Sequence, residues 1–260
     1  MKNPAGRLPL SPLSSKIKAA ALTLGVIVAF TGSTRILKLD MAKFLTRLKN
    51  AGPVLKRFAV ADFSVAGTAA LEMLASLAIA LAALSIGFVL SLALAFLAAE
   101  NTAPSKTLSA FIKGATAVVR AVPALVWMLM IVASIGFGNT AGLFGLLFPT
   151  CGYLIKSFAS SIEERGTGTI EALRATGANW FSIVLKGVLP MVFAPVMTWT
   201  AMRMEFNIAE SINLGMVGVS GIGAYLMRVL GKYDYGAVST IVIVILAVML
   251  AMEAAVNRLR

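Results

Sequence analysis

Long apolar runs without a charged side chain constrain the fold of this chain more than any other feature. One of them, from about Met73 to Ala98, extends over 26 residues with no Asp, Glu, Lys or Arg. A helix crosses the hydrocarbon core of a bilayer with about 20 apolar residues. Apolar residues make up 59% of the chain and charged residues 13%, whereas soluble domains usually carry about 45–50% and about 25%. The chain is therefore predicted to be an integral membrane protein.

Runs bounded by polar residues or by Gly and Pro predict an all-α fold with about six transmembrane helices. They extend over about Ala19–Gly32, Met73–Ala98, Val118–Ile135, Ala141–Phe158, Ile183–Met202 and Ala237–Ala255. A tight break at Gly136–Gly138 separates the third run from the fourth. The first run is short and follows Lys16 and Lys18, a shape that also fits a signal peptide. Because no small-residue cleavage site follows it, we expect a retained anchor.

The basic residues orient these spans only weakly. With the N-terminus in the cytoplasm, 13 of the 23 Lys and Arg residues lie on the cytoplasmic side and 10 on the other, and cytoplasmic loops usually carry the excess. Much of the opposing charge lies in the segment Arg35–Arg57, whose apolar residues recur three, four or seven positions apart. This pattern predicts an amphipathic helix on the membrane surface, broken near Gly52-Pro53. Residues 1–70 are thus expected to hold an anchor and this surface segment, and residues 71–260 the transmembrane domain.

Composition argues against several kinds of chemistry. The chain has no His, the commonest catalytic base and metal ligand, and its one Cys, Cys151, cannot form an internal disulfide. No phosphate loop of the G-x-x-x-x-G-K-[ST] type is present, so the chain is not expected to be an ATPase itself. The net charge of +12 comes without a basic patch with interleaved aromatic residues, and basic loops at the membrane explain it better than nucleic-acid binding.

The polar stretch between the fourth and fifth spans predicts a helical segment outside the lipid. Two pairs match the Ser-x-x-Glu capping pattern of a helix start: Ser160 with Glu163, and Ser161 with Glu164. Gly166 and Gly168 predict a break, after which Ile170–Thr176 forms a short helix that ends at a left-handed Gly177.

This short helix offers a candidate docking face. Leu173 and the small residues Ala172 and Ala175 are expected to form the face, with Glu171 and Arg174 at its rim. An ordinary solvated loop helix is the alternative interpretation.

The spacing in this stretch resembles the signature of ABC importer permeases, which reads E-A-A, three residues, G, nine residues, I-x-L-P. Glu171-Ala172, Gly177 and Leu189-Pro190 match it, while Leu173 replaces a small residue and Gly187 replaces Ile. In that family the segment is a coupling helix that binds a separate nucleotide-binding subunit. The resemblance therefore implies a cytoplasmic coupling helix at about residues 160–178, with Glu171, Ala172, Leu173, Gly177 and Pro190 as coupling residues.

The family resemblance also implies partners and a location. The expected protein is a multi-pass, non-enzymatic subunit of the bacterial inner membrane, with a type I importer core and a cytoplasmic N-terminus. It is expected to act as a homodimer with two ABC ATPase subunits, which bind the ATP and Mg²⁺, and with an extracytoplasmic binding protein. No cofactor or metal is expected in this chain.

A second resemblance concerns the cargo. Arg120–Trp127 and Met202–Gly223 are similar to the phosphonate and phosphite branch of these permeases. Met202, Ala209 and Ser220 depart from the branch pattern. The resemblance implies a phosphonate, phosphite or related phosphorus oxyanion as cargo. A permease for another small solute such as an amino acid, an ion-driven carrier and a membrane enzyme are the alternatives.

The ionisable residues at the end of the fifth span form a candidate translocation path or gate. On a helix, Arg203, Asn207 and Glu210 share one face, whereas Glu205 cannot meet Arg203. Arg203 and Asn207 could offer donors to an oxyanion, or the charges could form an ion-pair lock. The glycines of the stretch that follows predict either close helix packing or a re-entrant element: Gly215, Gly218, Gly221 and Gly223. The branch resemblance implies that they belong to the same candidate path or gate.

Overall fold

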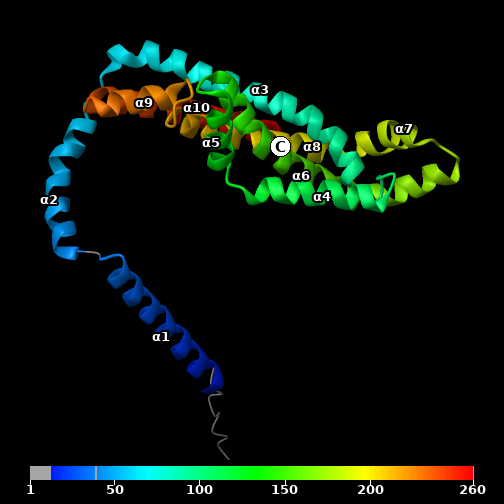
Figure 1. Ribbon diagram of the computed structural model, residues 1–260, viewed down its shortest axis with the longest axis horizontal. Coiled ribbons are helices and arrows are strands. Elements are labelled where there is room, and N and C mark those ends of the chain that lie inside the picture. The colour runs from blue at the N-terminus through cyan, green and yellow to red at the C-terminus, as the bar shows by residue number, and fades with distance from the viewer. Residues whose placement is uncertain (1–12, 39, 260) are drawn as a thin grey trace, which may run out of the picture. The chain divides into compact units, whose positions relative to one another are not determined.

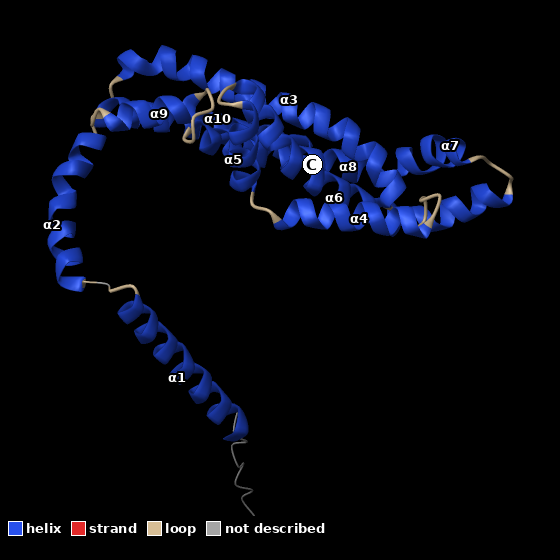
Figure 2. Ribbon diagram, in the orientation of Figure 1, coloured by secondary structure: helices blue, strands red, loops and turns tan. Residues whose placement is uncertain are grey.

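The computed structural model describes residues 13–38 and 40–259, and every regular element in these ranges is helical (Figure 2). The chain divides into two compact units, Met1–Lys56 and Arg57–Arg260.

The described residues of the first unit form α1 and most of α2, and both helices have exposed apolar surfaces. Helix α1 (Leu13–Ile36) is long and apolar enough to span a membrane, and α2 (Met41–Phe58) carries the predicted apolar stripe. The expected break near Gly52-Pro53 is wrong, because α2 continues through Pro53. Proline removes one helical hydrogen bond, and on an exposed helix water can satisfy the carbonyl that is left. The location of α2 on a membrane surface stays a prediction.

The second unit is a bundle of long helices (Figure 1). Its main elements are η1 (Phe63–Val65), α3 (Ala66–Ala98), α4 (Lys106–Ala121), α5 (Ala124–Ile135), α6 (Asn139–Ala175), α8 (Leu189–Gly215), α9 (Ile222–Gly231) and α10 (Tyr235–Leu259). Helices α3 and α6 make the most extensive contact, and α8 packs against both. One large apolar cluster, which includes Phe158, Val192 and Ile208, lies between these three helices.

Five helical segments of the described chain are long and apolar enough to span a membrane, and a bent pair gives a sixth. The pair is α4 and α5, which meet at 89°. The predicted continuous span Val118–Ile135 is therefore wrong. Pro123 lacks an amide donor and disfavours a helical residue before it, and Val122 is indeed extended, with ψ 123°. The predicted break between the third and fourth spans is confirmed, because Gly136 and Gly138 have φ of 86° and 136°.

Helix α6 runs well past the predicted fourth span. It continues without interruption through Gly166 and Gly168, so the predicted break and the two predicted caps are wrong. Ser161 lies within the helix and donates to the carbonyl of Ser157 at 3.0 Å. A glycine costs a helix only about 1 kcal/mol, and burial of Ile162 and Ile170 on either side of the glycines stabilises the continuous helix.

The predicted fifth span is likewise longer than expected. Helix α7 (Trp180–Ser182), the π-helical turn η2 (Ile183–Val188) and α8 follow one another and form a 36-residue candidate span, Trp180–Gly215. The wide turn lies just before Pro190, and the amide of Leu189 donates to the carbonyl of Val184, five residues back. A π turn of this kind accommodates a proline whose ring would clash in a regular helix. Arg203 to Glu210 therefore lie inside a continuous helix.

Candidate coupling segment and intramembrane polar cluster

The last turns of α6 and the turn to α7 form one end of the second unit, at the right of Figure 1. Glu171, Ala172 and Ala175 are exposed there, whereas Leu173 is half-buried and packs against the main apolar cluster. The prediction that Leu173 belongs to the outer docking face is thus wrong. The exposed face is small and polar, and Leu173 connects it to the bundle. We call residues 170–178 the coupling segment.

Gly177 ends α6 as predicted. Its φ is 75°, the amide of Gly177 donates to Arg174 O at 3.0 Å, and the amide of Ala178 donates to Leu173 O at 3.2 Å. These two bonds form the Schellman motif, in which a left-handed residue satisfies the last carbonyls of a helix. The sharp reversal places the exposed face at the tip of the turn.

Replacing Gly177 with Ala should lower the thermal stability of the purified protein. A left-handed conformation costs an L-residue about 1–2 kcal/mol. Gly168→Ala is the matched control, because Gly168 lies in the helix, where an added Cβ would meet open space, and Ala is the better helix former. Thermal unfolding of both variants tests this. Equal melting temperatures for the two would contradict the role of Gly177.

Gly187 in the π turn and Leu173 in the coupling segment fit each other. A Cβ at Gly187 would collide with Leu173 Cδ1, and the next nearest atom would be Thr169 Cγ2 at 3.6 Å. These two positions are the ones at which the chain departs from the E-A-A signature. A large residue at 173 and a missing side chain at 187 therefore compensate each other in volume, and they join the coupling segment to the start of the α8 span.

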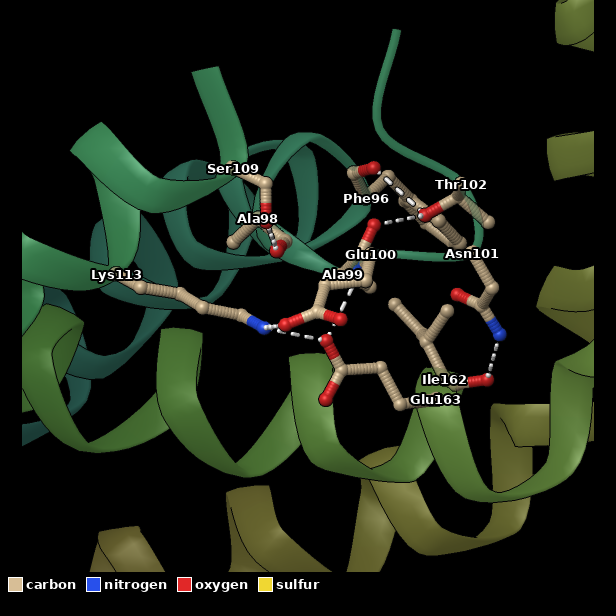
Figure 3. A network of polar contacts seen from close by, with 10 residues as sticks. All are labelled: Phe96, Ala98, Ala99, Glu100, Asn101, Thr102, Ser109, Lys113, Ile162 and Glu163. Carbon is tan, nitrogen blue, oxygen red and sulfur yellow. Dashed lines mark hydrogen bonds and ion pairs between the residues drawn. The ribbon is translucent and has the colours of Figure 1, made fainter. Parts of the chain in front are cut away.

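The α3–α4 loop (residues 99–105) contacts both the coupling segment and the start of α7. Arg174 Nη2 donates to the carbonyl of Asn101 at 3.1 Å, and Trp180 Nε1 donates to the carbonyl of Thr102 at 2.7 Å. Asn101 Nδ2 donates in turn to the carbonyl of Ile162 on α6 at 2.9 Å (Figure 3). The segment is thus attached to two different parts of the bundle.

A group of charges that was not predicted from the sequence lies next to this loop. Lys113 on α4 forms ion pairs with Glu100 at 2.7 Å and with Glu163 on α6 at 2.8 Å, and the amide of Glu100 donates to Glu163 at 2.9 Å (Figure 3). The hydrogen bond from Lys113 lowers the pKa of the Glu100 carboxyl. The contribution of this pair is therefore present at neutral pH and is lost as the pH falls through that lowered value. In the sequence, these three charged residues were marked only by their position at the borders of the apolar runs.

The predicted polar face of α8 is confirmed. Arg203 Nη2 lies 2.7 Å from Glu210 Oε2, its Nε donates to the Thr150 hydroxyl at 3.3 Å, and its guanidinium lies over the ring of Tyr153 at 5.8 Å. Arg203 is only 5% exposed. The charge is therefore compensated and hydrogen-bonded within the bundle, as a buried ion needs to be.

Asn207 extends this cluster to a third helix. It is fully buried; its Oδ1 lies 2.9 Å from the Thr150 hydroxyl on α6, and its Nδ2 donates to the carbonyl of Ala80 on α3 at 3.4 Å. The polar cluster of Arg203, Asn207, Glu210 and Thr150 thus connects α3, α6 and α8. Thr150 was not identified from the sequence, because a threonine in an apolar run carries no distinctive signal.

Glu205 does not join this cluster. It is half-buried and forms no hydrogen bond or ion pair with the residues that the structure describes. The expectation that it would not meet Arg203 is confirmed.

The glycines after α8 allow two backbones to approach closely. A Cβ at Gly223 would collide with the carbonyl of Ile212, and one at Gly215 would lie 2.7 Å from the amide of Ala224. Gly218 and Gly221 have φ of 102° and 120°. The turn thus returns α9 directly against the end of α8, which favours close packing.

A hydrogen bond joins this turn to α3. The hydroxyl of Ser76 accepts from the amide of Ile222 at 3.0 Å. Gly221 lies so close to Ser76 that a Cβ there would collide with the hydroxyl oxygen.

The predicted site residues therefore fall into two separate groups. The residues predicted to act in coupling lie at one end of the bundle, where Pro190 follows the π turn, whereas the polar cluster and the glycines lie further along α8 and at its far end. Residues 91–260 match the family described as "Binding-protein-dependent transport system inner membrane component". The chain belongs to this family.

Curated relatives are similar over most of the permease. The phosphite transport system permease protein PtxC of Stutzerimonas stutzeri is 33% identical over 216 residues, which cover 83% of this chain and 78% of that protein. The phosphate-import permease protein PhnE of Mycolicibacterium smegmatis is 29% identical over 94% of this chain and 46% of its own length.

Solved structures share the fold. The methionine ABC transporter MetNI, in an inward-facing conformation, contains a chain with a TM-score of 0.63 and 21% identity, covering 72% of this permease and 91% of that chain. A chain of an amino acid ABC transporter gives a TM-score of 0.62 at 17% identity, over 76% of this permease and 97% of that chain. At these identities the likeness concerns the fold alone.

Proposed function

We propose that this permease imports a phosphorus oxyanion of the phosphite, phosphonate or phosphate type, delivered by an extracytoplasmic binding protein. The observation that carries the proposal is the similarity to relatives named for phosphite and phosphate import, over most of this chain. The run Met202–Gly223, which resembles the phosphonate and phosphite branch, adds to it.

Energy comes, in this proposal, from a separate ATPase subunit that binds ATP and Mg²⁺. The permease works as a pair of identical copies, each of which holds one ATPase subunit through the exposed face of Glu171, Ala172 and Ala175. Closure of the ATPases on ATP draws the two coupling segments together and opens the path towards the binding protein, and hydrolysis resets it. The half-buried Glu205, which has no partner among the described residues, is assigned to the contact between the two copies.

In this proposal, movement of the coupling segment reaches the bundle through two sets of contacts. One runs from Leu173 through Gly187 to the π turn and α8. The other runs from Arg174 and Trp180 to the α3–α4 loop. Both α3 and α8 contribute to the polar cluster. Displacement of the coupling segment therefore moves the helices that the cluster connects.

The polar cluster acts, in this proposal, as an intramembrane lock near the gate. Glu210 neutralises Arg203, and Asn207 Nδ2 donates to the carbonyl of Ala80. A dianion would meet a compensated pair here instead of a free cation. The glycines Gly215, Gly218, Gly221 and Gly223 hold α9 against α8 at the far end of the same helix.

The proposed topology places the coupling segment and the N-terminus in the cytoplasm. The coupling segment must face the ATPase, and counting the spans back from it through α6, the α4–α5 pair, α3 and α1 puts the N-terminus on the same side. The polar cluster then lies between the coupling segment and the extracytoplasmic end of α8.

Reconstituted uptake tests the proposal. Proteoliposomes that contain the permease, its ATPase and its binding protein should accumulate radiolabelled phosphite, methylphosphonate or phosphate when supplied with ATP, and not methionine. Accumulation of methionine but of none of the three oxyanions would contradict the cargo. Oxyanion uptake that continues without the ATPase would contradict the ATP-driven mechanism.

A further inference from the structure

A pocket between α4 and α6 holds cationic side chains that the proposed transport mechanism does not use. It has a volume of about 270 Å³ and extends along α6 from Ile155 to Glu163. Its polar lining consists of Lys113, Thr116, Arg120, Lys156, Ser160 and Glu163. We call it the α4–α6 pocket.

The geometry brings Arg120 and Lys156 to the same pocket. The aliphatic stem of Arg120 crosses α6 at Gly152, where an added Cβ would lie 3.0 Å from Arg120 Cγ. Lys156 is one turn further along α6 and lines the pocket with Arg120. The absence of a side chain at Gly152 thus lets Arg120 lie over α6 next to Lys156.

The carboxylates of Glu100 and Glu163 share a single ammonium partner beside the pocket, so this group of three keeps one negative charge. Glu163 and Glu100 both pair with Lys113 (Figure 3). Arg120 and Lys156, in contrast, form no ion pair with any residue that the structure describes. Both residues are exposed, and the three cations of the lining outnumber the two carboxylates beside it, so the pocket attracts an anion.

Two hydroxyl groups complete the lining. Thr116 is 7% exposed and Ser160 is half-buried, and neither hydroxyl is hydrogen-bonded to another described residue. Cations that only anchor a helix at the membrane surface need neither a pocket nor hydroxyl donors. A guanidinium, an ammonium and two hydroxyls are the donors that proteins use for phosphate-type oxygens.

We propose that the α4–α6 pocket binds a tetrahedral phosphorus oxyanion group, with Arg120 and Lys156 as the principal ligands and Thr116 and Ser160 as hydroxyl donors. The same chemistry is present in a free phosphite or phosphate ion and in the headgroup of phosphatidylglycerol. If the ligand is the free ion, the pocket is an inner binding station of the permease, and this assignment rests on the proposed function. Binding itself does not depend on it.

Variants that remove one cation at a time test the pocket. The complex of permease and ATPase, without binding protein, is placed in nanodiscs of phosphatidylcholine, and phosphite binding is measured by phosphorus NMR line broadening. Arg120→Gln and Lys156→Gln should each weaken binding about tenfold, the effect of losing a charge-assisted hydrogen bond. Lys106→Gln removes the same charge from the exposed start of α4, outside the pocket, and should leave binding within about twofold.

A second measurement distinguishes the two sources of the anion. Phosphatidylglycerol that stays with the detergent-purified complex is quantified by mass spectrometry for the same variants. Loss of phosphite binding in R120Q and K156Q, but not in K106Q, supports the free ion. Loss of retained phosphatidylglycerol in the same pattern, without phosphite binding, supports the headgroup. If the three variants behave alike in both measurements, the proposal is wrong. Because no transport is measured, failure of oxyanion uptake in the reconstituted system remains a separate result.

Discussion

Replacing Gly187 with Ile should destabilise the permease by about 2 kcal/mol and reduce ATP-driven uptake. The Ile side chain would collide with Leu173, and overpacking of a filled site costs about 1–3 kcal/mol. The collision displaces the coupling segment from the start of the α8 span, so the segment can no longer transmit movement along this route. Uptake by proteoliposomes and the thermal stability of the complex measure the effect.

Adding Leu173→Ala to Gly187→Ile should reverse the loss of uptake. Leu173→Ala alone removes a side chain that packs on the apolar core and should cost about 2 kcal/mol. The double variant L173A/G187I places the large residue on the other side of the contact, which is the arrangement that the E-A-A signature prefers. It should recover most of the uptake, with a coupling energy of about 1–3 kcal/mol between the sites. Additive losses would show that the two residues do not compensate each other.

Replacing Arg203 with Met should destabilise the permease by about 3 kcal/mol, because it leaves the Glu210 carboxylate unpaired in the bundle. The side chain of Arg203 is 6% exposed and that of Glu210 is 26% exposed, so some of the cost is relieved at Glu210. Thr150 also loses the donor that its hydroxyl accepts from. A fall in melting temperature and in the yield of assembled complex should follow.

The double variant R203M/E210Q distinguishes a lock from a cargo ligand. Replacing both charges of a buried pair is often nearly neutral, unlike the removal of one. We expect the double variant to regain the lost stability and to transport within a few-fold of the unchanged protein. Restored stability with uptake still abolished would show that Arg203 acts on the cargo directly, which would contradict the lock.

The apolar runs predicted which segments are helical spans but not where the helices bend or end. Met73–Ala98 lies within α3, because an uncharged run of that length has no alternative in a bilayer. The bend before α5 was missed, although Pro123 signals it, since hydropathy is insensitive to a local break. The opposite error occurred at Gly166 and Gly168, where packing of Ile162 and Ile170 overrides the low helix propensity of glycine.

Local spacing predicted parts of the candidate site that depend on neighbouring residues in the chain. The left-handed Gly177 and the shared face of Arg203 and Glu210 are of this kind. The inward direction of Leu173 could not be predicted, because it depends on the empty position at Gly187. The contacts of Lys113 with Glu100 and Glu163 also depend on helix packing over long sequence separations.

The exposed small face of the coupling segment is central to the proposed mechanism, and a bulky residue on it gives the most direct test. Ala172 is exposed and belongs to that face. Ala172→Trp should leave the permease folded but abolish its association with the ATPase subunit, measured by co-purification, and with it ATP-driven uptake. Thr107→Trp, at an exposed position on α4, is the control and should keep both. If Ala172→Trp associates with the ATPase and transports as well as Thr107→Trp, the assignment of the coupling segment is wrong.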